Sequence, residues 1–312
     1  MTQESHDTAA RGRLRQMSVY FNGYKPVALW KTSTSFRSTS LKYRTQSDHP
    51  EQGPAEEFLV ASRFRRSAPE AETSIQSYFT DATVEMLSLA GAEPADPGAE
   101  VPLPAGTPLD MALGEALAQR RSRRLFTGDP VEAADLACLL RAAQGITAEA
   151  DVGLQAGGTA TLAFRTTPSG GGLYPVDLFL GTLNVTGQAR GVYRYNPVRD
   201  VLCREGDGDL LESVTGAFGV PEELLSLSQA GAVLLFAARP WRSMRKYGSR
   251  GLRFVFHEIG AMTENIHLAA AALGLGTVDC ASYFDAEMDR ALGLDGVYRT
   301  VLHTLVLGVP AE

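Results

Sequence analysis

Apolar and polar positions follow a regular pattern only in the last two thirds of the chain. Apolar residues recur every three or four positions in three stretches, which predicts helices at about Leu109 to Gln119, Val131 to Ala143 and Leu252 to Leu273. The third stretch is the longest and predicts a central helix that ends at a GLG sequence. Short apolar runs predict strands at Val176 to Leu183, Gly191 to Tyr195, Ala232 to Ala238 and Thr300 to Leu307. This mixture indicates an α+β fold.

The first hundred residues have a different character. Residues 11–66 are rich in Arg and Lys, whereas residues 67–110 contain neither and carry many Asp and Glu. Residues 91–108 are crowded with Gly and Pro, as expected of a linker or an extended strap. We therefore predict an N-terminal extension with its linker over residues 1–100 and one globular domain over residues 101–312. The aromatic residues among the cations suit a peptide or a partner protein, and an extension packed on the main domain is the alternative.

Composition narrows the class of partner. The formal net charge of −7 argues against a general nucleic-acid binder, which would carry a basic excess, and favours small molecules or peptides. No apolar run approaches the roughly 20 residues that span a bilayer, and the polar start lacks the apolar centre of a secretory signal, so we expect a cytoplasmic protein. The three cysteines show no disulfide or zinc-site spacing, so we predict core residues. The helical His257 and His267 have no second ligand at metal spacing, so we predict packed or interface residues and no metal.

A basic segment follows the first predicted helix. It reads Arg-Arg-Ser-Arg-Arg over residues 120–124. In an extended segment residues two apart face the same way, so Arg120, Ser122 and Arg124 would converge. Guanidinium groups and a hydroxyl suit a phosphate, because the planar fork of arginine donates paired hydrogen bonds. A solvated basic turn is the alternative.

A glycine-rich loop precedes the first long strand. It reads PSGGGLYP over residues 168–175. Successive glycines let the backbone approach a flat ligand closely and adopt conformations closed to other residues. The run lacks the GxxxxGK[ST] pattern and precedes a strand instead of opening a helix, which excludes a phosphate-binding P-loop and a dinucleotide fingerprint. A flexible loop is the alternative.

Four motifs in this order carry a family resemblance. The RRSxR segment, the PSGGGLYP loop, the long helix ending in ALGLG and the sequence Tyr283-Phe284-Asp285 resemble the nitroreductase-like FMN flavoproteins over about residues 101–312. Among these the chain most resembles the SagB-type azoline dehydrogenases, which act on ribosomally made peptides. One departure is Ala261, where many relatives of this subfamily carry histidine. The resemblance implies a nitroreductase-like fold, with a central mixed sheet flanked by helices, and a homodimer with FMN at its interface.

The same resemblance assigns roles to individual residues. Arg120 and Ser122 would hold the FMN phosphate with Arg121 beside them, and Arg124 would reach the N1/O2 edge, where positive charge stabilises the reduced flavin. The backbone around Ser282 and Tyr283 would lie near flavin N5. The wall against the ring system would be formed by Pro168, Ser169, Gly170 and Gly171.

A Lys-Tyr pair just before the long helix supports the subfamily. Azoline-oxidising SagB-type enzymes characteristically carry this pair, here Lys246 and Tyr247. Aromatising an azoline removes a hydride, which FMN accepts, and a proton, which needs a base. The resemblance implies that Lys246 is this base and that Tyr247 positions the ring or relays the proton. The pKa of Lys246 must then fall by about three units, through burial or through Arg245 and Arg250. A solvated helix start is the alternative.

These inferences lead to one main functional hypothesis and two alternatives. The main one is FMN-dependent dehydrogenation of thiazoline or oxazoline rings to thiazole or oxazole in a precursor peptide, with electrons passed to oxygen and a cyclodehydratase as a partner. The first alternative is a general NAD(P)H-dependent nitro or quinone reductase. The second is a non-catalytic docking subunit of a peptide-modifying complex.

Overall fold

The computed structural model describes residues 58–59, 61–63, 80–82, 99–154 and 157–311. The chain divides into two units, residues 1–63 and 64–312, and every strand and helix from Glu100 onward belongs to the second. The predicted role of the cation-rich stretch and the domain boundary at residue 100 fall largely outside the described residues, so both stay predictions.

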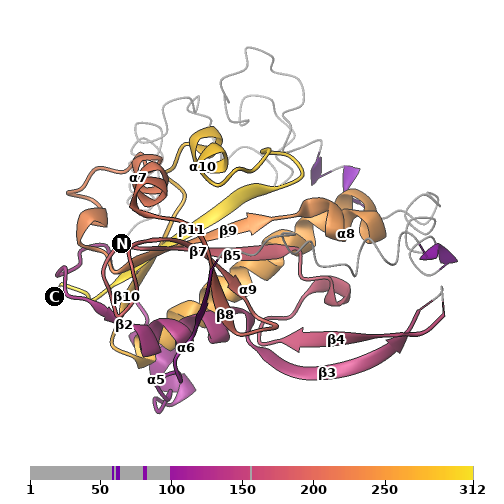
Figure 1. The fold of residues 1–312 in the computed structure, drawn as a ribbon, viewed down its shortest axis with the longest axis horizontal. Helices are drawn as coiled ribbons and strands as arrows, with labels where there is room; N and C mark the ends of the chain where they lie inside the picture. The colour runs from indigo at the N-terminus through magenta and orange to yellow at the C-terminus, as the bar shows by residue number, and fades with distance from the viewer. Residues whose placement is uncertain (1–57, 60, 64–79, 83–98, 155–156, 312) are drawn as a thin grey trace, which may run out of the picture. The chain divides into compact units, whose positions relative to one another are not determined.

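A seven-stranded sheet forms the centre of the second unit (Figure 1). Its neighbouring strands pair antiparallel. A parallel bridge between Ser122 and Thr277 extends the edge, so both kinds of pairing occur, as the resemblance implies. In spatial order the strands are β1 (Glu100–Pro102), β8 (Val201–Gly206), β7 (Gly191–Asn196), β5 (Val176–Thr182), β9 (Ala232–Ala238), β11 (Thr300–Gly308) and β10 (Gly276–Cys280).

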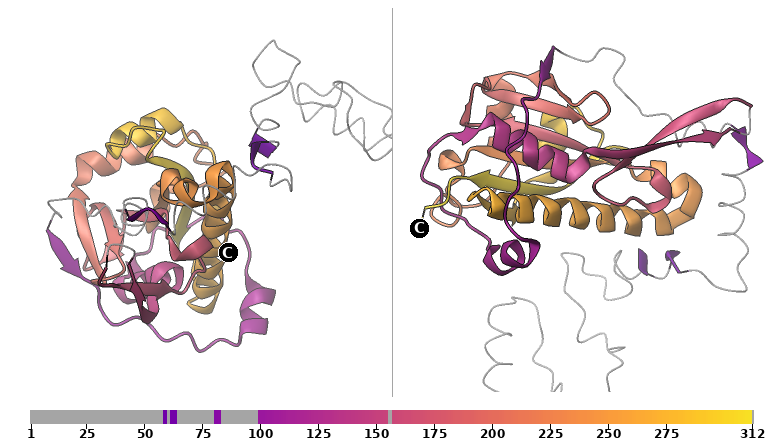
Figure 2. Two further views of the ribbon diagram at one scale, coloured as in Figure 1. Left: turned by 90° about the vertical axis from the view of Figure 1, so that its right-hand side faces the viewer. Right: turned by 90° about the horizontal axis from the view of Figure 1, so that it is seen from below.

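Helices cover both faces of this sheet, and each face buries its own hydrophobic cluster beneath them. Strand β9 is buried along its whole length, and its alternate residues enter two separate hydrophobic clusters. Helices α6 (Ala133–Gln144) and α9 (Gly251–Ala272) cover the first cluster, and α7 (Gly208–Gly216) and α10 (Asp285–Ala291) cover the second, as Figure 2 also shows. Two shorter helices, α5 (Leu113–Gln119) and α8 (Pro240–Tyr247), pack against α9.

The strongest sequence patterns are confirmed almost to the residue. The central helix, α9, and the strands β5, β7, β9 and β11 lie within one residue of their predicted bounds. Two predicted helices begin later than expected. Helix α5 begins at Leu113, four residues after its predicted start, and α6 begins at Ala133 because Val131 and Glu132 form a short strand, β2, that pairs with β6 (Val185–Thr186).

Three smaller features complete the description of the fold. The Gly- and Pro-rich segment contains β1, so part of it is an extended strap on the sheet. The three cysteines are free thiols, and burial raises the pKa of the Cys138 and Cys203 thiols, which makes both less reactive. Within the described part of the chain, no helix has the length and apolar character needed to cross a bilayer, and no cluster of His, Cys, Asp and Glu has metal-site geometry.

Candidate functional site

The glycine loop is a tight turn between two strands. It connects β4 (Thr159–Arg165) with β5, and Gly170–Gly172 form one turn of 3-10 helix. The φ angles of Gly171 and Gly172, 71° and 66°, lie in the left-handed region that favours glycine. The Ser169 hydroxyl accepts a hydrogen bond of 2.9 Å from the Tyr174 amide, which closes the turn. The loop is therefore a turn closed by a hydrogen bond, with two of its glycines in left-handed backbone conformations.

This loop lies directly against the Lys-Tyr pair. A Cβ atom placed on Gly171 would come within 2.5 Å of the Tyr247 hydroxyl oxygen and 3.2 Å of Lys246 Nζ. A Cβ atom on Gly170 would come within 3.0 Å of the Phe254 ring, which itself packs edge-on against Tyr247 at 4.9 Å between centroids. The structure thus brings together two motifs that lie about 75 residues apart in the sequence.

Alanine at position 171 should therefore destabilise the protein more than alanine at the adjacent glycine. The Gly172 site is a matched control, since it has a similar φ and no atom within 4 Å of an added Cβ. We expect G172A to lose about 1–2 kcal/mol of unfolding free energy through left-handed strain, and G171A to lose roughly a further 1–3 kcal/mol through overlap with Tyr247. Urea denaturation measures both, and equal losses would contradict the contact.

Lys246 occupies an environment that favours its neutral form. It lies in the last turn of α8, and only 8% of its surface is exposed. Burial lowers the pKa of its ammonium group, and no charge contribution from Arg245 or Arg250 accompanies that effect. The ammonium lies 5.5 Å from the centroid of the Tyr247 ring. Burial also raises the pKa of the Tyr247 hydroxyl, which therefore stays protonated. The pair combines a proton acceptor with a proton donor.

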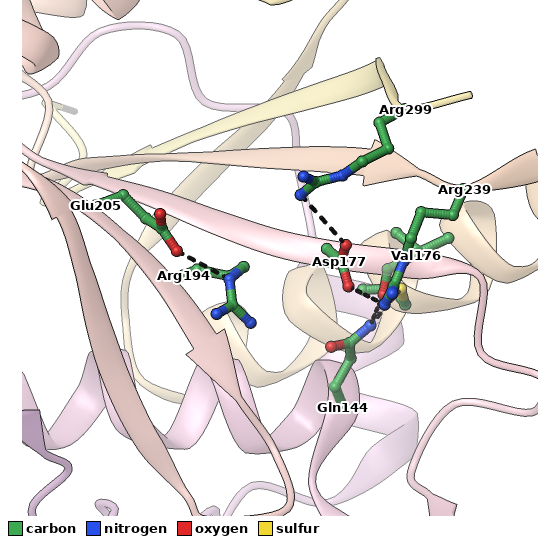
Figure 3. Close-up of polar contacts among 8 residues, drawn as sticks. Gln144, Val176, Asp177, Arg194, Glu205, Arg239 and Arg299 are labelled. Atoms are coloured by element: carbon green, nitrogen blue, oxygen red, sulfur yellow. Dashed lines mark hydrogen bonds and ion pairs between the residues drawn. The ribbon is translucent and has the colours of Figure 1, made fainter. Parts of the chain in front are cut away.

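Ion pairs and hydrogen bonds at β5 hold α8 and the loop in register. Figure 3 shows one carboxylate oxygen of Asp177, on β5, bound at 2.5 Å to Arg239, the residue before α8. The guanidinium of Arg299, the residue before β11, lies 3.9 Å from the other Asp177 oxygen. The same view shows Gln144 of α6 donating a hydrogen bond of 2.7 Å to the Val176 carbonyl. These contacts fix the strand that follows the glycine loop relative to the helix that carries Lys246.

Sequence reasoning missed a buried carboxyl beneath the loop. Glu258 of α9 is 2% exposed, and neither of its oxygens has a hydrogen bond of normal geometry. Burial raises its pKa to about 7, and the nearby Ser169 hydroxyl and Arg165 and Arg242 guanidinium groups only partly oppose this rise. The sequence did not show that Glu258 is buried. From the apolar pattern alone, a glutamate on the buried face of an amphipathic helix cannot be distinguished from one at the border between the apolar and polar faces.

The predicted phosphate-binding segment occupies a different place. Ser122 pairs with Thr277 of β10, and the Arg123 amide donates a hydrogen bond of 2.9 Å to the Thr277 carbonyl. Ser122 and Arg124 are exposed, and with Arg120 their side chains form no hydrogen bond or ion pair within the described residues. The guanidinium of Arg121 instead donates hydrogen bonds to the Ala118 and Arg120 carbonyls. Two guanidinium groups and one hydroxyl therefore lie on the segment that pairs with β10.

Ser282 and Tyr283 follow the opposite end of β10. Cys280 pairs with Thr304, so these two residues lie toward the end of the sheet where β9 leads into α8. The Tyr283 hydroxyl donates a hydrogen bond of 3.2 Å to the Val301 carbonyl, and the Ser282 carbonyl accepts one of 2.9 Å from the Gly219 amide. Both residues have a fixed backbone, and the Ser282 side chain is exposed.

The long helix separates the arginine segment from the Lys-Tyr pair. Lys246, Tyr247 and the glycine loop lie beside its first turns, whereas the arginines lie beside Thr277, just after its last turn. A helix of 22 residues is about 33 Å long. Within one chain the arginine segment and the Lys-Tyr pair therefore lie near opposite ends of α9.

A histidine network, also missed, supports the arginine side. His267 is buried, and its ring nitrogens lie 2.6 Å from the Thr277 hydroxyl and 2.9 Å from Asp279. His303 lies 2.8 Å from the other Asp279 oxygen, and bonding to both histidines holds the pKa of this carboxyl below its usual range against the opposing effect of burial. His267 is therefore packed, as predicted, whereas His257 on the same helix is exposed.

Comparisons with known proteins agree with this architecture. The model of the nitroreductase family matches residues 117–309. A nitroreductase-like protein of Methanocaldococcus jannaschii is 32% identical over 183 residues, which are 59% of this chain and 85% of that protein. The microcin B17-processing protein McbC of Escherichia coli is 30% identical over 149 residues, 46% of this chain and 52% of that protein. A solved nitroreductase-like structure from Ralstonia eutropha has a TM-score of 0.53 at 24% identity and covers 72% of this chain and 97% of its own. The chain belongs to the nitroreductase family.

Proposed function

We propose that this protein is an FMN-dependent dehydrogenase that converts thiazoline or oxazoline rings in a ribosomally made peptide to thiazole or oxazole. The observation that carries the proposal is the contact between the glycine loop and the buried Lys246-Tyr247 pair. A nitroreductase-family protein is an oxidoreductase, and a buried lysine with a lowered pKa adds a base to it. The likeness to a microcin-processing protein over about half of that protein's length points to a peptide substrate.

Members of the nitroreductase family bind FMN, and the residues present here fit that group. The glycine loop offers bare backbone at Gly172, where no atom lies within 4 Å of an added Cβ, and this suits a flat ring. Arg120, Ser122 and Arg124 offer cationic and hydroxyl donors that suit a phosphate and an electron-rich ring edge. Because the two sets lie at opposite ends of α9, we propose that each site combines residues from two copies of the chain in a homodimer.

The chain's own residues divide the reaction between them. FMN, when bound, would supply the acceptor for the hydride that leaves the azoline carbon. Lys246 takes the proton from the adjacent ring atom on Nζ, and its burial keeps a fraction of the amine neutral for that purpose. Tyr247 keeps its proton and orients the azoline by donating a hydrogen bond. The glycine loop excludes water from one side of the azoline ring.

The test is direct turnover. Purified protein with FMN and oxygen should remove two hydrogens for each ring from a synthetic thiazoline peptide, measured by mass spectrometry. A general nitro or quinone reductase is the second candidate, because the archaeal relative matches over most of its length. Steady NAD(P)H oxidation with a nitroaromatic acceptor, together with no loss of hydrogens from the peptide, would select that candidate. A cyclodehydratase should form the azolines that this enzyme consumes.

Flavin affinity tests the arginine half of the site. We expect R120A and R124A each to weaken FMN binding about 10- to 100-fold, as expected for a lost charge-assisted hydrogen bond. R121A is the matched control, because the Arg121 guanidinium already bonds to backbone carbonyls of its own segment, and its effect should be smaller. Titration of flavin fluorescence measures all three, and equal losses would remove the assignment.

A further inference from the structure

A two-stranded hairpin leads into the glycine loop. Strand β3 (Ile146–Gly153) follows α6 directly, and β4 ends at Arg165, three residues before Pro168. Among the described residues the two strands pair only with each other. Figure 1 shows them projecting from the body of the second unit, and Figure 2 shows the same from below. An isolated pair of strands is marginally stable in water unless something covers one face.

The hairpin has one apolar face and one polar face. Side chains alternate between faces along a strand, and the register pairs Ala150 with Leu162. The opposite face carries Thr147, Glu149, Asp151 and Thr161, where the Thr161 hydroxyl bonds to Asp151 at 2.7 Å. Phe164 on the apolar face is 39% exposed. The apolar face consists of Ala148, Ala150, Val152, Ala160, Leu162 and Phe164.

Both outer edges of the hairpin carry open backbone groups. In an antiparallel pair, hydrogen-bonded and open residue pairs alternate. The Leu154 amide bonds to the Gly158 carbonyl at 3.1 Å, so the register makes Asp151–Thr161 and Glu149–Ala163 open pairs, whose N–H and C=O groups point outward. Neither strand contains Pro or Lys, the usual protections of an edge. The outer edge of β4 is also free of carboxylates at these positions, unlike that of β3.

The area of the hairpin's apolar face favours a peptide over a second folded protein as its binding partner. Seven residues by two strands give a face of roughly 23 by 10 Å, about 230 Å². A stable interface between two proteins needs about 800 Å² from each partner. A second copy of the chain would therefore need much more surface than this face, whereas an extended peptide of six or seven residues can pair along one edge as a third strand and extend the face.

We infer that the β4 edge binds an extended segment of the peptide substrate by strand addition, an inference that rests on the proposed function. The segment bonds to the outward N–H and C=O groups of Thr161 and Ala163, and every second side chain lies on the apolar face beside Leu162. Because β4 continues into the glycine loop, a ring on the same peptide is delivered toward Lys246. The favoured substrates carry uncharged segments with apolar residues at alternate positions.

Proline scanning of the two edges tests this inference. Proline at an open position removes an outward N–H and spares the bonds within the hairpin. With FMN-loaded enzyme, A163P should raise KM about fivefold or more for a 12-residue thiazoline peptide with alternating valines, the effect of about one backbone hydrogen bond. Its kcat and its turnover of a small 2-methylthiazoline amide should not change. E149P, on the β3 edge, should leave the KM and kcat for the peptide and the turnover of the small amide unchanged. An unchanged KM in A163P, equal effects in both variants, or a changed oligomeric state in A163P would overturn the inference.

Amide exchange of the unaltered holoenzyme provides a second measurement. The peptide should protect the outward amides of Thr161 and Ala163 and leave that of Leu162, already bonded within the hairpin, unchanged. Protection of Glu149 and Asp151 instead, or of neither edge, would overturn the inference. If no variant oxidises any azoline, the proposed function fails, and this exchange pattern still decides whether the hairpin binds an extended peptide.

Discussion

Alanine in place of Lys246 is expected to lower azoline turnover by about 10²- to 10⁴-fold, the range for removal of a general base, while flavin binding and folding persist. The lysine is 8% exposed, and burial lowers its pKa, so its amine loses the proton at a lower pH than an exposed lysine does. For the unaltered enzyme, kcat/KM should therefore rise with pH as Lys246 deprotonates and level off above its lowered pKa. K246A should lack this rise.

The neighbouring arginine is a suitable control for this experiment. Arg245 precedes Lys246 in the same turn of α8 but is exposed, and R245A should retain the pH profile. Flavin absorbance and thermal unfolding should show that both variants are folded and contain FMN. If K246A retained both the rate and the rising limb, another group would be the base, and the proposed mechanism would have to be abandoned.

Glutamine in place of Glu258 is expected to remove about 3 kcal/mol of pH dependence from the free energy of unfolding. The carboxyl titrates near 7 in the folded protein and near 4.5 in the unfolded chain, so between these values the folded state binds more protons. The stability contributed by the protonated group is therefore complete below about pH 4.5 and is lost as the pH rises to about 7. E258Q mimics the neutral acid and does not titrate.

The measurement is the difference between the unaltered protein and E258Q at two pH values. Urea denaturation at pH 5 and pH 8 should show that E258Q gains relative stability at the higher pH. E264Q, which replaces an exposed glutamate on the same helix, should show no such gain. A pH-independent difference for E258Q would mean that Glu258 ionises as an ordinary carboxyl despite its burial.

Local sequence patterns predicted the elements that depend on a strong repeat. The central helix and strand β9 bury long apolar series, so hydrophobic periodicity alone placed their ends within a residue. The pattern did not predict the β3–β4 hairpin, because half of the positions on its apolar face are alanine, which gives a weak signal. It also extended the helix at α6 backward over Val131 and Glu132, because an apolar residue before a helix looks like part of it until a distant strand, β6, pairs with it.

Motif chemistry predicted which residues matter but not how far apart they lie. The glycine loop and the Lys-Tyr pair do meet, through the close contact of Gly171 with Tyr247. The arginines were expected around the same ring, yet within one chain they lie beyond the other end of a 22-residue helix. A motif states which side chains are present, and only the packed helix sets the distance between them.

The amino-acid sequence by itself determined the fold class, the long helix, the main strands and the identity of the glycine, arginine and lysine motifs, since these follow from local periodicity and side-chain chemistry. The tertiary structure alone decided that Lys246 is buried, that Glu258 is buried near Ser169 of the loop, and that the hairpin strands, among the described residues, pair only with each other. The physical reason is that burial, desolvation and edge pairing depend on residues distant in the chain, which no local pattern specifies.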